Sequence, residues 1–454
     1  MTVASQYTFR YPFASGLTTK GSLRTLRLAT FREGKDASGW FFEGQLTNPQ
    51  RAAGLLRAVT QIVKSRFHMP AAMLSRIVAE SDPVVTANDD RLRFEGFSAC
   101  CGVYVRADFL KPSFQGEIKG RGTTNVDFNA PMLSALAKVR RGDQIGLAIG
   151  NDQLVLKKES GDVVEKKVRL PIRWMKGFVE VQTVQSRMEL VHELSGLHSL
   201  KFFRSLPRMQ THRRATFVTS AGSGLRLSQT DSANGVRVGG LERLRVLETI
   251  AKDAESLKVF ADNATAASGW VLDFGDSRFH LVLSPEVWRG FSGEGQALTS
   301  LASVDRTVLP KVKVRLKWQS VVDEVKLARS LKLQAPVIRA VLQTLGTRGN
   351  VGYDLSERAY FHREMPFDIS QVEKQQPRLL AARKLMESGS VRITRMTPAL
   401  AEIRVDSSGV EHRVEIRSDE SFKCTCPWYN KHQETRGPCK HVLAGQLMLE
   451  NQAE

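Results

Sequence analysis

Four residues near the end of the sequence have the types and spacing of a metal-binding set. They are Cys424, Cys426, Cys439 and His441. Three sulfurs and one imidazole nitrogen fill the tetrahedral shell of Zn²⁺ and leave no open position for a substrate. The spacing therefore predicts a closed, structural zinc site. His432 lies between the two pairs and is an alternative fourth ligand, but His441 is favoured because it stands beside Cys439 where a helix is expected to start.

The segments around these residues must form a small module that holds them. Apolar and charged residues alternate in 403–405 and 414–417, with turn residues at 406–409 between them, so a hairpin is predicted. Residues 442–450 favour a helix. Lys423 and Lys440 each stand next to a ligand, where their charge offsets that of the bound thiolates.

This pattern resembles a known family. Cys-x-Cys, twelve residues and Cys-x-His on a strand-strand-helix background are similar to the SWIM zinc finger, a ββα module. The resemblance covers about residues 400–450, and all four ligand positions match. It implies zinc binding and contacts with DNA or proteins, because SWIM modules accompany Swi/Snf-type ATPases, transposases and recombination factors. The upstream region also resembles bacterial SWIM-finger proteins, some of which accompany MoxR-type AAA ATPases and von Willebrand A-domain proteins.

Cations and aromatic residues lie in and beside the loop that would close over the metal. They are Lys423, Trp428, Tyr429, Lys431, Arg436 and Lys440. We expect Trp428 to pack beneath the hairpin, because so small a module needs an aromatic residue in its core. Tyr429 and Arg436 are then the candidate contacts with nucleic acid, Tyr429 by stacking on a base or sugar.

The composition indicates a folded, strongly basic protein. The 454 residues include 66 Lys and Arg against 47 Asp and Glu, a net charge of +19. Such a charge favours polyanionic partners, nucleic acid first and an anionic membrane second, and the resemblance favours DNA among the nucleic acids. No signal peptide or run of about 18 apolar residues is apparent. Five cysteines, three of them near the C-terminus, fit a metal site in a reducing compartment, so a cytoplasmic protein is expected.

Two basic stretches are candidate nucleic-acid contacts. The first contains Lys201, Arg204, Arg208, Arg213 and Arg214, and reads as an exposed connector interrupted by Pro207. In the second, Lys311, Lys313, Arg315 and Lys317 alternate with Val312, Val314, Leu316 and Trp318. In a strand this alternation places four cations on one face, where a phosphate backbone is a natural neighbour. The alternative is a solvated edge strand that its lysines protect against aggregation.

The fold class is predicted to be α+β and multidomain, with helices covering antiparallel sheets. The expected units are 1–112, 113–305, 306–397 and 398–454, the last being the ββα zinc finger. Within 113–305 a tandem repeat is expected, because helix-like runs at 131–139 and 241–251 are each followed by paired strands. These strands lead to 171–178 and 285–291, which share proline, tryptophan and Gly-Phe. Sliding-clamp modules share that coarse order.

Shorter patterns predict individual elements. Asn48 and Pro49 should begin a helix with an apolar face. Cys100 and Cys101 read as buried thiols within a strand. A helix at 336–345, a glycine-rich turn and 353–365 predict a winged-helix-like unit, and 377–387 predicts a further helix that ends at Gly389.

Sequence motifs of the common enzyme classes are missing. The chain has no GxxxxGK[ST], HExxH, GxSxG or strand-bounded GxGxxG run. The sequence therefore predicts a non-catalytic, zinc-binding subunit of a larger complex that binds nucleic acid. The alternative is a protein-interaction adaptor in an AAA ATPase and von Willebrand A-domain system, and a third reading is a transposase or nuclease remnant.

Overall fold

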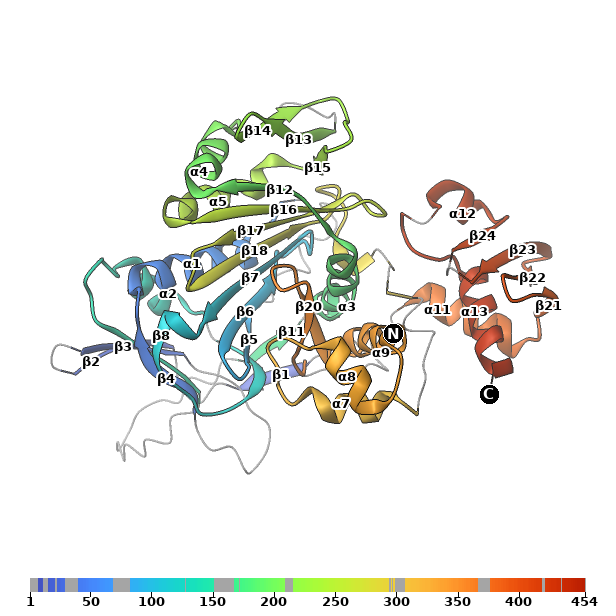
Figure 1. Cartoon of the computed structure of the whole chain (residues 1–454), viewed down its shortest axis with the longest axis horizontal. Coiled ribbons are helices and arrows are strands. Elements are labelled where there is room, and N and C mark those ends of the chain that lie inside the picture. The colour runs from blue at the N-terminus through green and yellow to red at the C-terminus, as the bar shows by residue number, and fades with distance from the viewer. Residues whose placement is uncertain are drawn as a thin grey trace.

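The computed structural model of the chain confirms an α+β architecture with several antiparallel sheets (Figure 1). The described residues are 7–10, 15–20, 23–28, 40–67, 82–126, 128–150, 167–170, 172–208, 215–293, 295, 297–298, 307–365, 376–418, 421–433 and 435–453. None of the helices in this part of the chain combines the length and the apolar character needed to span a bilayer.

An eight-stranded antiparallel sheet forms the centre of the molecule. Across the sheet the strands are β12 (Glu189–Ser195), β16 (Ser256–Asp262), β17 (Ala267–Asp273), β18 (Ser277–Leu283), β7 (Val103–Leu110), β6 (Arg91–Phe97), β5 (Val84–Ala87) and β9 (Gly122–Asn125). The pairing of β18 with β7, from Ser277↔Phe109 to Leu283↔Val103, joins segments that are far apart in the sequence. The two halves of the sheet therefore share one hydrophobic core.

One face of this sheet is apolar and packs under α1 (Pro49–Lys64). The predicted helix start is confirmed, because the Asn48 side chain accepts a hydrogen bond from the Arg51 amide and Pro49 follows it. A stripe that includes Leu55, Leu56 and Val59 is buried against the sheet. Two further helices, α2 (Ala130–Ala137) and α5 (Arg245–Ile250), pack beside α1.

Smaller elements surround the central sheet. A second sheet has the order β2 (Gly16–Lys20), β3 (Leu23–Leu28), β10 (Ile145–Gly150), β4 (Trp40–Leu46) and β8 (Phe114–Ile118), and a third has β14 (Gly224–Ser228), β13 (Thr216–Ala221) and β15 (Val236–Val238). The remaining elements before residue 300 are β1 (Tyr7–Arg10), β11 (Lys167–Leu170), α3 (Ile172–Arg187), α4 (Gly196–Ser205), η2 (Lys111–Ser113), η3 (Leu241–Leu244), η4 (Ala251–Asp253) and η5 (Phe291–Gly293).

The two segments that were expected to repeat are not placed alike. The strand that follows the first helical run is β10, which lies in the five-stranded sheet, whereas β17 and β18 lie in the central sheet. Residues 172–178 begin the long helix α3, whereas most of 285–291 forms no regular element. The shared tryptophan and Gly-Phe therefore occur in different local structures, and Pro171 lies outside the described residues.

The two adjacent cysteines do not lie in a strand. Cys100 and Cys101 stand in the turn between β6 and β7, which closes where the Ser98 amide donates to the Val103 carbonyl at 2.9 Å. Both side chains are buried, as expected, and burial raises the pKa of the Cys101 thiol to about 12. This thiol is accordingly a packing residue.

Residues 309–362 form a three-helix unit followed by a hairpin, which agrees with the winged-helix-like prediction. The elements are α7 (Leu309–Leu316), α8 (Glu324–Leu331), α9 (Ala335–Thr347), β19 (Val351–Asp354) and β20 (Ala359–His362). The unit has a hydrophobic core of its own, which includes Val312, Leu327, Ile338 and Leu342.

The prediction of a strand over 311–318 is wrong, because this segment forms α7 and the turn after it. Leu309, Val312 and Leu316 are buried at a spacing of three and four residues, whereas Val314 is 73% exposed. When apolar residues occupy every second position, residues four positions apart are also apolar, and this spacing fits one face of a helix. Pro310 in the first turn favours the helix. The cations therefore do not share one strand face.

The C-terminal module lies at one side of the molecule in Figure 1. It contains α11 (Pro377–Glu387), a sheet of β21 (Val391–Met396), β22 (Leu400–Ser407), β23 (Val410–Arg417) and β24 (Phe422–Cys424), and the helices α12 (Pro427–His432) and α13 (Lys440–Ala453). The predicted hairpin and the helix that precedes Gly389 are both present. Because α11 packs on α13, the packing unit begins before β21.

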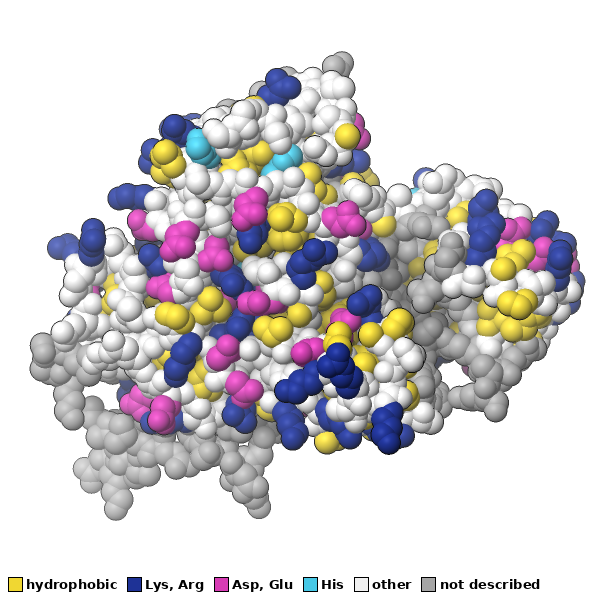
Figure 2. Space-filling view, in the orientation of Figure 1, with side chains coloured by type: hydrophobic (Ala, Val, Ile, Leu, Met, Phe, Trp, Pro, Cys, Tyr) yellow, Lys and Arg dark blue, Asp and Glu magenta, His cyan; other side chains and the backbone are white. Residues whose placement is uncertain are grey.

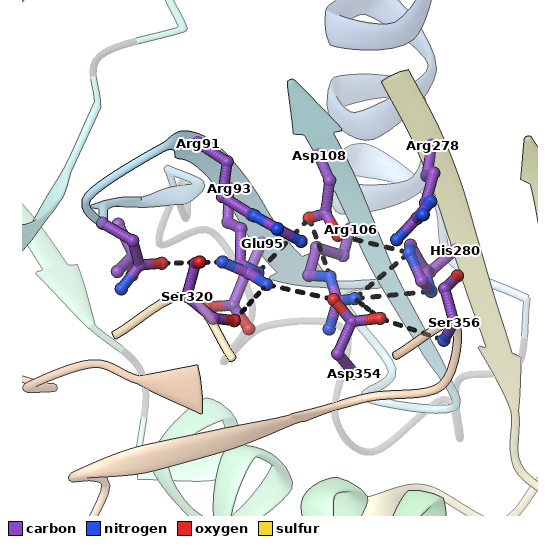
Figure 3. Close-up of polar contacts among 12 residues, drawn as sticks. Arg91, Arg93, Glu95, Arg106, Asp108, Arg278, His280, Ser320, Asp354 and Ser356 are labelled. Carbon is purple, nitrogen blue, oxygen red and sulfur yellow. Dashed lines mark hydrogen bonds and ion pairs between the residues drawn. The ribbon is translucent and has the colours of Figure 1, made fainter. Parts of the chain in front are cut away.

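The second face of the central sheet carries a buried ion network that binds the hairpin β19–β20 (Figure 3). Arg106 lies 2.8 Å from Asp108 on its own strand and 3.0 Å from Asp354 of β19. Arg93 of β6 lies 3.0 Å from the second oxygen of Asp354. All four side chains are almost completely buried, and His280 of β18 lies 3.3 Å from Asp108. Two carboxylates thus neutralise two guanidinium groups around one imidazole.

We predict that Asp354→Asn destabilises the protein strongly. The change removes the Asp354 carboxylate and leaves Asp108 as the remaining carboxylate of the network for the buried Arg93 and Arg106. Breaking a buried ion pair costs about 3–5 kcal/mol of stability. The free energy of unfolding from urea denaturation measures this. Asp406→Asn is the matched control, because its pair with Arg392 is about half exposed and should contribute less than about 1 kcal/mol. Equal effects of the two changes would contradict the role given to the network.

We also predict that His280 makes stability depend on pH. Burial, and then Arg106, lower the pKa of this imidazole, so below about pH 6.5 the unfolded chain takes up a proton that the folded chain does not. The contribution of His280 to the free energy of unfolding is therefore fully present above about pH 6.5. It falls on acidification by up to about 1.4 kcal/mol per pH unit. Urea denaturation between pH 7.5 and 5 should show a weaker pH dependence for His280→Asn than for the unchanged protein.

Candidate functional site

The four predicted ligands come together in the C-terminal module. Cys424 ends β24, Cys426 caps α12, Cys439 directly precedes α13, and His441 lies in the first turn of α13. All four side chains are buried, and their ligand atoms lie within 4.8 Å of one another. The arrangement is a compact Cys₃His cluster that could hold a metal ion.

The chemistry of the cluster fits a tetrahedral zinc ion. With Zn–S bonds of about 2.3 Å, neighbouring sulfurs of such a shell lie about 3.8 Å apart, which agrees with the observed spread of the ligand atoms. Backbone amides support the sulfurs, since Tyr429 N–H donates to Cys426 at 3.4 Å and Val442 N–H donates to Cys439 at 3.5 Å. Hydrogen bonds from Cys424 and then Cys439 lower the pKa of the Cys426 thiol, so this sulfur carries negative charge most readily.

The structure decides between the two histidines. Nδ1 of His441 lies 3.8 Å from the sulfur of Cys424, whereas His432 stacks on Trp428 at a ring distance of 4.3 Å and is not part of the cluster. The structure thus places His441, the histidine favoured from the sequence, beside the three cysteines. Lys423 is exposed and Lys440 is half-buried, so both can offset thiolate charge from the rim.

A hydrophobic core beneath the cluster holds the ligands in place. It includes Ile403, Val405 and Val414 from the hairpin and Val442 and Leu443 from α13. The helix approaches the sheet closely at Gly445, where a Cβ would lie 2.9 Å from the Ile403 side chain. The short module therefore combines a thin core with a metal cluster, as expected for a unit too small to be stabilised by burial alone.

A groove of about 750 Å³ runs beside the cluster. Val410, His412, Pro427 and Trp428 contribute to its wall, and Val410 is 55% exposed. The guanidinium of Arg378 lies 4.8 Å from the centre of the Trp428 ring, and that of Arg436 lies 5.5 Å from it. Trp428 thus packs against the core of the module, as expected, and it also lies beside two cations and lines the groove.

Tyr429 has a structural contact. Its hydroxyl donates to the Phe422 carbonyl at 2.7 Å, and its ring packs at the edge of the Phe422 ring. This side chain therefore ties α12 to β24. Its use as a stacking platform for nucleic acid stays a prediction, and Trp428 is the aromatic residue that borders the groove.

The two basic stretches lie in different parts of the fold. Lys201 and Arg204 are exposed on α4, Arg208 is exposed just after it, and Arg213 and Arg214 lie outside the described residues. Lys311, Arg315 and Lys317 are exposed on and after α7, whereas Lys313 lies 3.7 Å from Glu364. Figure 2 shows Lys and Arg side chains gathered over α7 and α8.

A second group of metal-ligand types, Asp108, His280 and Asp354, was not anticipated from the sequence. Guanidinium groups of Arg93 and Arg106 already lie against both carboxylates at 2.8–3.0 Å, so a cation here would add positive charge to a balanced network. We interpret this group as structural. The sequence feature that could have revealed this group is the alternation of charged and apolar residues along β6 and β7.

Comparisons with known proteins do not assign the chain to a family. No family model matches it, and no curated protein matches it. Among solved structures, the proliferating cellular nuclear antigen from Entamoeba histolytica is similar over 54% of this chain and 99% of that chain. The sequence identity is 10% and the TM-score is 0.35, which is too low to support an argument about function.

We predict that natively purified protein contains close to one zinc ion per chain. Cys439→Ser should remove a ligand, release the metal and unfold the C-terminal module, including α11, while the central sheet stays folded. Elemental analysis and hydrogen exchange measure the two effects. Cys100→Ser is the control, because this buried thiol lies outside the cluster, and His432→Gln should likewise keep its zinc whereas His441→Gln should not. Full zinc content in Cys439→Ser would contradict the assignment.

Proposed function

We propose that this chain is a non-catalytic, zinc-containing protein that binds nucleic acid, most favourably DNA, as a subunit of a larger complex. The observation that carries the proposal is the exposed positive charge of the three-helix unit. Residues 309–348 contain nine Lys and Arg residues, and Asp323 and Glu324 are the acidic residues among them. A surface of this kind supplies the phosphate contacts that dominate affinity for nucleic acid.

The acidic residues in this unit have structural partners. Asp323 caps α8 by accepting a hydrogen bond from the Lys326 amide at 2.9 Å, and Glu324 lies 3.0 Å from Arg339. The exposed cations Lys311, Arg315 and Lys317 are the members of the predicted set that remain at the surface of α7 and its end. Their charge is available to phosphate groups.

We further propose that the C-terminal module is a SWIM-type zinc finger. Its support is the match of Cys424, Cys426, Cys439 and His441 to the spacing of that module, together with a hairpin before the cluster and a helix after it. In this proposal zinc holds the module folded, and the chain performs no chemistry at the metal because all four ligand positions are filled by side chains.

A protein-interaction adaptor, with an AAA ATPase system among its candidate partners, is the second proposed function. The groove beside the metal cluster supports it, because Val410, Pro427 and Trp428 bring apolar surface to its wall. Apolar grooves with aromatic walls are typical of protein and peptide contacts. In this case the positive charge would not determine the affinity for the partner.

Salt dependence distinguishes the two functions. We predict that binding to a nucleic-acid duplex weakens steeply between about 50 and 200 mM salt. Replacing Lys311, Arg315 and Lys317 by Gln should lower the slope of log K against log salt by about two to three units, if each cation meets one phosphate. Fluorescence anisotropy with labelled duplexes measures this slope.

Arg392, Arg404 and Arg413 provide the matched control, because each is paired with a carboxylate on the sheet of the C-terminal module. Their replacement by Gln removes the same charge and should change the slope little. Binding that is insensitive to salt, or absent for every nucleic acid tested, would favour the adaptor.

A further inference from the structure

The helices α8 and α9 form a helix-turn-helix. They are joined by Lys332, Leu333 and Gln334. Lys332 takes the left-handed conformation with φ of 58°, and its amide donates to the carbonyls of Ala328 and Arg329, which ends α8 sharply. Residues of both helices are buried in one small core. Two helices that pack across so short a turn are typical of proteins that insert the second helix into a DNA groove.

The two halves of α9 differ in exposure. The C-terminal half is buried against α3, where a Cβ at Gly346 would lie 2.4 Å from the Gln182 side chain. In the N-terminal half, Pro336, Arg339 and Ala340 are exposed and Val337 is 38% exposed. The exposed side of the helix thus carries mostly small side chains, so its backbone can approach a ligand closely. In helix-turn-helix proteins, the N-terminal residues of the second helix contact the base edges.

The charge of this surface is uniform. From Val325 to Tyr353 the sequence contains no Asp or Glu. The cations in this stretch are Lys326, Arg329, Lys332, Arg339 and Arg348. Lys326 and Arg329 are exposed on α8, and Lys332 is exposed in the turn. They flank the outward half of α9 with groups that attract phosphates.

The hairpin that follows α9 is held against the body of the protein. At its tip Glu357 lies 2.6 Å from Arg278 and 3.2 Å from Arg91, both on the central sheet. Asp354 belongs to the buried ion network. The hairpin therefore cannot swing out as a wing along a duplex, and the helices alone must make the contact.

We infer that the N-terminal half of α9 enters the major groove of double-stranded DNA, with Arg339 at the base edges and Lys326, Arg329 and Lys332 at the flanking phosphates. This inference rests on the proposed nucleic-acid binding. It adds that the ligand is double-stranded DNA and that α9 contacts the bases. Duplex DNA is favoured over duplex RNA, because the DNA major groove admits a helix whereas that of RNA is too deep and narrow. On binding, Arg339 exchanges its contact with Glu324 for contacts with the DNA.

Ala340→Glu tests this placement in the full-length, zinc-loaded protein. It adds a carboxylate to an exposed site at the middle of the reading surface. Affinity for a pool of random-sequence DNA duplexes should fall by about tenfold or more, at least the loss that a mismatched base pair causes. Ala233→Glu adds the same charge at an exposed alanine between β14 and β15, and should change the affinity by less than about twofold.

Three further variants separate binding from folding. Ala340→Lys places a side chain of similar size at the same site, so it should keep or increase affinity if the site faces DNA and lose it if bulk alone unfolds the unit. Arg339→Gln should weaken binding, whereas Arg358→Gln, which removes an exposed arginine at the hairpin tip, should not. Zinc content and circular dichroism confirm that each variant is folded.

The outcomes distinguish the inference from the function on which it rests. If the unchanged protein binds no polyanion in a salt-dependent manner, the proposed nucleic-acid binding fails. If it binds DNA but Ala340→Glu and Ala233→Glu behave alike, only the role of α9 is overturned. Equal affinity for an RNA duplex of the same sequence would also overturn insertion into the major groove, whereas a loss confined to Ala340→Glu and Arg339→Gln supports it.

Discussion

The ion network between the central sheet and the hairpin β19–β20 fixes how the three-helix unit is placed against the sheet. Arg93, Arg106, Asp108 and Asp354 are removed from water, and such charges are tolerated only when each one has its partners. Asp354 must therefore stay within hydrogen-bond distance of two strands. Because the hairpin is continuous with α9, this requirement orients the whole three-helix unit relative to the sheet.

That orientation has a consequence for the surface. The hairpin is used for internal contacts, and the Arg93 guanidinium also donates to the Ser320 carbonyl in the segment that follows α7. The sheet thus holds the unit at the connection between α7 and α8 and at the hairpin, while α8 and the first half of α9 carry exposed residues. The C-terminal module is organised differently, because its four candidate metal ligands all come from one short segment of the chain.

The sequence predicted what is encoded locally. The Cys/His cluster has a specific chemistry and a short spacing, and the start of α1 has a cap and a proline, so both could be recognised. The strand expected at 311–318 was wrong because alternation and helical spacing coincide there, and the burial of Leu309 and Leu316 distinguishes the helix from the strand. The ion network was missed because Arg93, His280 and Asp354 are far apart in the sequence, and no local pattern encodes their meeting.

The acidic residues balance the cations to different degrees in different parts of the chain. On the sheet of the C-terminal module, Glu402 and Glu411 pair with arginines of the neighbouring strands, so much of the charge there is balanced in place. In the three-helix unit Asp323 caps α8 and Glu324 pairs with Arg339, and the stretch from Val325 to Tyr353 contains cations and no Asp or Glu. The surface of α7–α9 therefore keeps more unbalanced positive charge than the sheet of the C-terminal module, and should attract a polyanion more strongly over long range.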